Sequence, residues 1–164
     1  MIRRPVSSNV AAILLVMLGP LALPATAREV AVVTVTAAAK GTFPNGTTYQ
    51  GVSLNGLRFG TGVEIPGDTS ATGEFQGTLL GTSGGQPQNM IIEGEVSSGS
   101  ASGGTATFSG TCSVDKGDGT PVSMGVPFTV TITTDAEGRG TIVLRLGTTT
   151  LPTATVNEGS MTIQ

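Results

Sequence analysis

The sequence is short of the residues that carry most protein chemistry. Among its 164 residues there is no His and no Trp, one Tyr and one Cys. Histidine is the commonest general base and a frequent metal ligand, so its absence removes the usual basis of acid–base catalysis and of transition-metal centres. The single thiol, Cys112, cannot form a disulfide within the chain. We therefore expect no cofactor and no metal, and the composition favours a protein that is not an enzyme.

Charge is also scarce. Only 12% of the residues are charged, about half of the usual share in soluble domains. Hydrophobic residues make up 38% of the chain, which argues against a disordered protein. The basic residues are scattered, whereas nucleic-acid binding requires a concentrated basic surface. The sequence therefore predicts one folded domain that does not bind nucleic acid.

The first 27 residues have the three parts of a secretory signal peptide. Arg3 and Arg4 form a positive start, residues 10–18 are continuously apolar, and Ala25 and Ala27 give a small-x-small cleavage pattern. A membrane span needs about 20 apolar residues, so we expect cleavage after Ala27 rather than a retained anchor. The predicted product is one domain of residues 28–164, secreted to the periplasm or the medium and without a transmembrane anchor.

Apolar and hydroxyl side chains alternate through the second half of the chain. From residue 105 this period of two is typical of a strand with one buried face, and the inward set is Ala106, Phe108, Gly110, Cys112 and Val114. Further strands are predicted at 126–133, 141–146 and 154–156, with a last strand around Met161 and Ile163 after a turn at 157–159. Short connections join antiparallel neighbours, so this half is predicted to be a five-strand meander.

The first half is less regular. Strands are predicted at 29–36, 48–54, 57–63, 71–80 and 89–97, with 81–88 and 97–104 as loops. The dipeptide Asn55-Gly56 favours a hairpin turn, because type I′ turns need positive φ at both central residues. Inward glycines, Gly77, Gly94 and Gly110, would permit bends or bulges. The predicted fold is all-β: a single antiparallel domain of about nine or ten strands, either a sandwich or a closed barrel.

Two carboxylates are the best candidates for chemistry. Glu93 and Glu95 lie two apart on one predicted strand, so they share a face, and Glu74 could lie beside them on the preceding strand. Paired carboxylates perform glycoside hydrolysis. The alternative is a charged outer face that favours solubility. Sugar-cleaving sites also use aromatic platforms, and only 4% of this chain is aromatic, so we favour the alternative.

Three other features have a plain structural interpretation. Asp115 and Asp118 suggest a calcium loop, but glycines stand where further oxygen ligands would be needed, which favours a hairpin turn. Cys112 lies on an inward face without a base beside it, so we expect a buried, inert thiol. Asn45-Gly46-Thr47 matches a glycosylation sequon, and we interpret it as a turn after Pro44.

Rows of threonine raise one further idea, since flat arrays of Thr can order water as in some ice-binding proteins. Such arrays usually come with a sequence repeat, and this chain has none. Thr is also simply a favourable outward strand residue. The rows are Thr105 and Thr107; Thr129, Thr131 and Thr133; and Thr153 and Thr155.

Three functions follow from these observations. We place first a secreted binding or structural module without catalysis and of unknown partner. The first alternative is a carrier whose interior holds a small lipophilic ligand, because inward small residues would leave room for one. The second alternative is a hydrolase that uses Glu93 or Glu95. An interior cavity would favour the carrier, and a cleft with two carboxylates at catalytic distance would favour the hydrolase.

Overall fold

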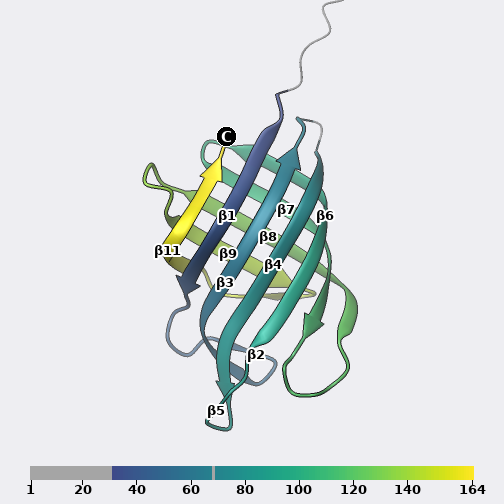
Figure 1. The fold of residues 1–164 in the computed structure, drawn as a ribbon, viewed down its shortest axis with the longest axis vertical. Helices are drawn as coiled ribbons and strands as arrows, with labels where there is room; N and C mark the ends of the chain where they lie inside the picture. Colours follow the sequence, from purple (N-terminus) through teal and green to yellow (C-terminus); the bar gives the residue numbers. More distant parts are fainter. Residues whose placement is uncertain (1–30, 68) are drawn as a thin grey trace, which may run out of the picture.

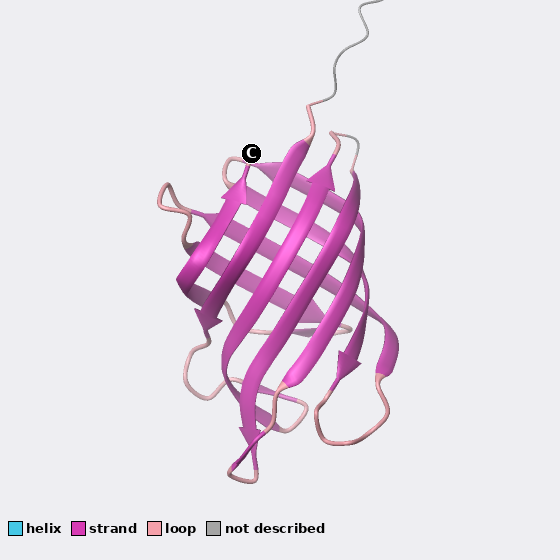
Figure 2. Cartoon of the chain, in the orientation of Figure 1, coloured by secondary structure: helices cyan, strands magenta, loops and turns pink. Residues whose placement is uncertain are grey.

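The computed structural model describes residues 31–67 and 69–164 and consists of strands joined by turns (Figures 1 and 2). Eight long strands pair in a ring, in the order β1-β3-β4-β6-β7-β8-β9-β11 and back to β1. Every pairing is antiparallel, and each long strand pairs with its neighbour in sequence. The chain is therefore an up-and-down sheet that closes on itself, the barrel alternative of the two predicted architectures.

Three short strands extend the ring at its ends: β2 pairs with β3, β5 with β4, and β10 with β9. The strands are β1 (Val33–Thr42), β2 (Thr48–Tyr49), β3 (Val52–Ile65), β4 (Ser70–Ser83), β5 (Gln86–Pro87), β6 (Met90–Ser102), β7 (Thr105–Asp115), β8 (Ser123–Thr134), β9 (Gly140–Leu146), β10 (Thr149–Thr150) and β11 (Ala154–Ile163).

The ring has a near and a far layer in the view of Figure 1. In Figure 1, β11, β1, β3, β4 and β6 lie side by side, and β7, β8 and β9 cross behind them. Side chains that alternate along each strand point into the space between the layers, as the period of two predicts. On β7 the inward positions Ala106, Phe108, Cys112 and Val114 are all buried.

Aromatic rings occupy the centre of this interior. Phe75 is fully buried, and its ring lies 5.8 Å from that of Phe128, 6.3 Å from that of Phe108 and 6.5 Å from that of Phe59. Two of the inward glycines make room for these rings. A Cβ on Gly94 would lie 2.7 Å from the Phe128 ring, and one on Gly77 would lie 3.1 Å from the Phe75 ring.

The predicted hairpin turn at Asn55-Gly56 is wrong. Strand β3 runs straight through it, and the dipeptide forms an irregularity in the register with β4. A Cβ on Gly56 would lie 3.0 Å from the carbonyl oxygen of Gly41 on β1. Glycine is therefore used here for close approach of two strands, and the chain reverses earlier, around Gln50 and Gly51.

Two more segments, one predicted as a turn and one as a loop, are parts of strands. The predicted turn at 157–159 lies inside β11, where Gly159 has a φ of +85° and the strand continues to Ile163. The second half therefore has four long strands and the short β10 instead of five. The predicted loop 97–104 is mostly the end of β6, which pairs with β7 as far as Ser102 and turns at Gly103-Gly104.

The predicted signal peptide lies outside the described residues. So do residues 29 and 30, the first two of the predicted strand 29–36. Within residues 31–67 and 69–164 no helix is long and apolar enough to cross a membrane.

Candidate functional site: the charged outer face

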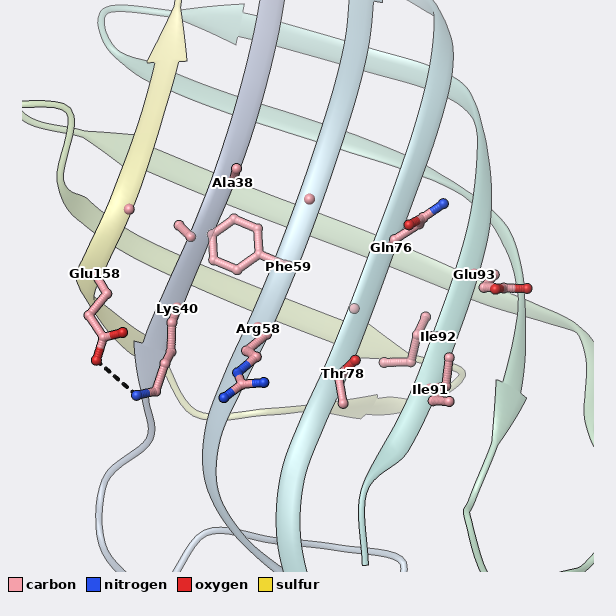
Figure 3. Close-up of a pocket in the computed structure, with 14 residues that line it drawn as sticks. Ala38, Lys40, Arg58, Phe59, Gln76, Thr78, Ile91, Ile92, Glu93 and Glu158 are labelled. Carbon is pink, nitrogen blue, oxygen red and sulfur yellow. Dashed lines mark hydrogen bonds and ion pairs between the residues drawn. The ribbon is translucent and has the colours of Figure 1, made fainter.

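The outer face of β11, β1, β3, β4 and β6, which we call the charged face, carries a shallow hollow of about 560 Å³ (Figure 3). Small residues form its middle, chiefly Ala38 and Gly60, and longer polar side chains border it. Figure 3 shows Lys40 and Arg58 at one side and Glu93 at the other.

The candidate carboxylates lie at the acidic end of this face. Glu93 and Glu95 are both exposed on the outer side of β6, and Glu74 lies directly opposite Glu95 on β4. The sequence thus predicted correctly that the first two share a face and that Glu74 is near. All three border a second open hollow of about 500 Å³, beside the exposed Met124. Whether these carboxylates perform any chemistry stays a prediction.

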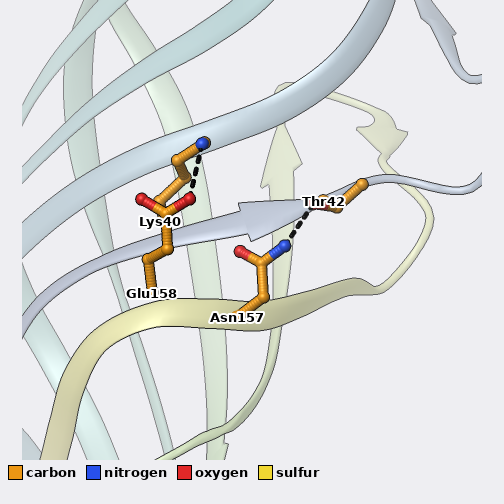
Figure 4. A network of polar contacts seen from close by, with 4 residues as sticks. All are labelled: Lys40, Thr42, Asn157 and Glu158. Atoms are coloured by element: carbon orange, nitrogen blue, oxygen red, sulfur yellow. Dashed lines mark hydrogen bonds and ion pairs between the residues drawn. The ribbon is translucent and has the colours of Figure 1, made fainter.

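The basic end of the face was not found from the sequence. Lys40 on β1 lies directly opposite Arg58 on β3 and, on its other side, opposite Glu158 on β11. The Lys40 ammonium donates to the Glu158 carboxylate over 2.8 Å, and this hydrogen bond and charge hold the pKa of Glu158 below its usual value (Figure 4). Since these residues are far apart in sequence, only the register of the strands places them together.

The middle of the charged face is bare because two strand glycines face outward: Gly60 lines the hollow, and Gly62 lies at the next outward position of β3. Gly60 and Gly62 have no positive φ; a Cβ on Gly60 would come no closer than 3.7 Å to another atom, and one on Gly62 would meet nothing within 4 Å. The other glycines within the strands each have either a positive φ or a contact under 3.4 Å that excludes or crowds a side chain. Packing and backbone geometry within the chain therefore do not require glycine at these two positions.

The outer face of β7, β8 and β9, the hydroxyl face, contrasts with this. Its Ser and Thr residues align in register from strand to strand, so Thr105 faces Thr133, which faces Thr141. The Oγ1 atoms of Thr105 and Thr133 are 3.2 Å apart, and those of Thr107 and Thr131 are 3.0 Å apart. Strand pairing aligns these hydroxyls in the absence of a sequence repeat, and neighbouring hydroxyls bond to each other.

The candidate calcium loop and the candidate glycosylation sequon form the hydrogen bonds that are typical of turns. The Asp115 carboxylate accepts a hydrogen bond from the Gly117 amide at 2.9 Å. The Asp118 carboxylate accepts from the hydroxyl and from the backbone amide of Thr120, the latter at 2.9 Å, and these two bonds lower the pKa of Asp118. In the sequon, the buried Thr47 hydroxyl donates to the Pro44 carbonyl at 2.7 Å. Asn45 is exposed.

Cys112 is buried, and burial raises the pKa of its thiol from 9.0 to about 11. A higher pKa means less thiolate at a given pH, by about a hundredfold near pH 8 for this difference. We expect Ellman's reagent to modify the folded protein at least about a hundredfold more slowly than the protein in denaturant. Equal rates in the two conditions would contradict a buried thiol.

Comparison of the chain with protein-family models, with curated proteins and with solved structures finds no match.

Proposed function

We propose that this chain is a secreted binding or structural module that performs no catalysis and that works through the outer surface of its closed sheet. The observation that carries the proposal is the division between interior and exterior. In the part of the chain that the structure describes, the buried side chains with a hydroxyl are Thr47, which bonds within a turn, and Tyr49, which accepts from the Gln50 amide. No charged side chain is buried there. Charged and hydrogen-bonding groups available to a partner are therefore on the outside.

The carrier alternative has less support. It relied on inward small residues leaving room for a ligand, but the phenyl rings of Phe75 and Phe128 lie where side chains on Gly77 and Gly94 would project. The hollows described above open on the outer surface rather than into the sheet. The hydrolase alternative has a close carboxylate pair in its favour, Glu74 and Glu95, but these groups are exposed rather than enclosed with substrate.

Native mass spectrometry of the exported protein tests the proposal. The full chain would be expressed in a bacterium with a periplasm and purified from the periplasm and the medium. We expect the mass of residues 28–164 without an additional component, and no saturable binding of the lipophilic dye anilinonaphthalene sulfonate. Peptide sequencing of the N-terminus should begin at Arg28.

A co-purified lipophilic compound, or saturable dye binding by the folded protein, would favour the carrier and overturn the proposal. Retention of the uncleaved chain in the membrane fraction would contradict its secreted location. The Phe75→Ala variant is a positive control for the dye, because removing this ring exposes apolar interior surface through a cavity or through loosened packing.

A further inference from the structure

We infer that the charged face binds a second copy of this chain about a twofold axis that lies in the plane of the face. This goes beyond the proposed function, since a monomeric module would satisfy that proposal equally well. The inference starts from the unequal distribution of charge on the face, where like charges lie directly opposite each other in two places: Lys40 beside Arg58, and Glu74 beside Glu95.

Such like-charge pairs on neighbouring strands destabilise a sheet. Within the described residues the chain offsets only part of this cost, because the single ion pair joins Lys40 to Glu158 and Arg58 is attracted to the same carboxylate without forming an ion pair. Among residues 31–67 and 69–164, no basic side chain forms an ion pair with Glu74, Glu93 or Glu95. Both ends of the face are therefore available to charges of opposite sign on another molecule.

The two ends match each other across one axis. Arg58 and Glu93 are two strands apart and offset by two residues along the strands, which gives about 12 Å between their Cα atoms. Lys40 and Glu95 are three strands apart and offset by four residues, or about 20 Å. The line that joins each pair runs in nearly the same direction across the sheet. The midpoints of both lines fall on β3–β4, close to Gly60 and Gln76. A single twofold axis there brings Arg58 onto Glu93 of the second copy and Lys40 onto its Glu95 at the same time.

The bare middle of the charged face lies where the two copies would come closest. Gly60 is beside the axis, and Ala38 and Gly62 continue the flat surface around it. Because the fold itself does not require glycine at 60 and 62, close approach of another backbone gives these residues a role. The exposed Ile91, at the border of the hollow, adds apolar surface to the contact.

The expected dimer is weak. The face measures about 20 Å by 30 Å, or about 600 Å² on each copy, which is at the lower end of the range for specific interfaces. The opposed charges give orientation and salt dependence more than affinity. We therefore expect reversible association in the micromolar to millimolar range that weakens as salt is added.

A charge-swap experiment tests the inference. The exported protein would be studied by sedimentation equilibrium from about 10 μM to about 1 mM, as wild type and as the variants Arg58→Glu and Glu93→Arg. Each variant alone places two pairs of like charges across the axis and should associate at least about tenfold more weakly. An equimolar mixture places opposite charges at both contacts, so it should form a heterodimer at wild-type concentrations, visible by native mass spectrometry.

Matched controls make the same charge changes elsewhere: Arg145→Glu on β9 and Glu137→Arg in the β8–β9 turn should associate as wild type does. Gly60→Gln should fold normally, because a side chain has room there, and should associate less. A wild type that stays monomeric up to about 1 mM, variants that associate normally, or a mixture that stays monomeric would each overturn the inference. Association lost equally in the controls would also overturn it, since the effect would then be one of net charge.

Discussion

The Phe75→Ala variant should lose about 3–5 kcal/mol of unfolding free energy, a large part of the 5–15 kcal/mol that a domain usually has. Phe75 is fully buried and its ring is within 6.5 Å of three other rings. Truncation removes its apolar burial and leaves a cavity that neighbouring rings can fill only in part. It also removes aromatic contacts worth about 0.5–1.5 kcal/mol each. Urea unfolding followed by circular dichroism measures the loss.

The adjacent residue supplies the control. Gln76 follows Phe75 on β4 but is exposed on the outer face, so Gln76→Ala should change the unfolding free energy by no more than about 0.5 kcal/mol. If Phe75→Ala lost less than about 1 kcal/mol, the interior would be loosely packed and the carrier alternative would regain its basis.

Replacing Gly159 by alanine should destabilise the protein by about 2–4 kcal/mol. Gly159 has a φ of +85°, which side chains rarely adopt, and a Cβ there would overlap the carbonyl oxygen of Ala38 and lie 2.7 Å from the Ala39 Cα. The residue lies in the pairing of β11 with β1, the contact that closes the ring. Alanine would therefore strain the backbone and separate these two strands at once. Thermal and urea unfolding measure the effect.

Gly62→Ala is the matched control on the same sheet. Its φ is ordinary and no atom lies within 4 Å of the added Cβ, so alanine should be neutral or should stabilise the strand by up to about 1 kcal/mol by restricting the unfolded chain. Equal destabilisation by both substitutions would contradict the distinction between glycines that the fold requires and glycines that it does not.

The alternation of side chains was enough to predict the fold class and most strands. It works where one face is buried, as on β7, where four of the five predicted inward residues are buried and Gly110, beside the backbone of Glu95 on β6, is only half-buried. It fails at bulges, because a bulge uses the residues that turns use. Gly56 and Gly159 were both predicted in turns, and both lie within strands whose partners approach too closely for a side chain. Local sequence carries no signal for that approach.

The candidate site also has one part that the sequence predicts and another that only the structure reveals. The sequence was enough to place Glu93 and Glu95 on the same face of the sheet, because they are two residues apart on one strand. Lys40, Arg58 and Glu158 come from three strands and meet only through the register of β11, β1 and β3. The role of Gly60 and Gly62 needed the structure as well, because an outward glycine is recognised only when its surroundings are known to be open.

The central claim is that the eight long strands close into a ring, so that none of them is an edge strand along its whole length. Hydrogen exchange of backbone amides by nuclear magnetic resonance tests it most directly at β1, the first strand of the ring, and at Thr155 and Val156 of β11, the last strand. These residues have ladder partners on both sides, so their amides should be protected as continuously as those of β7 and β8. Beyond Val156, β11 forms a ladder with β1 alone, so the remainder of β11 does not enter the test. If every second amide of β1 exchanged rapidly, as in an edge strand, the ring would be open and the account of both outer faces would be wrong.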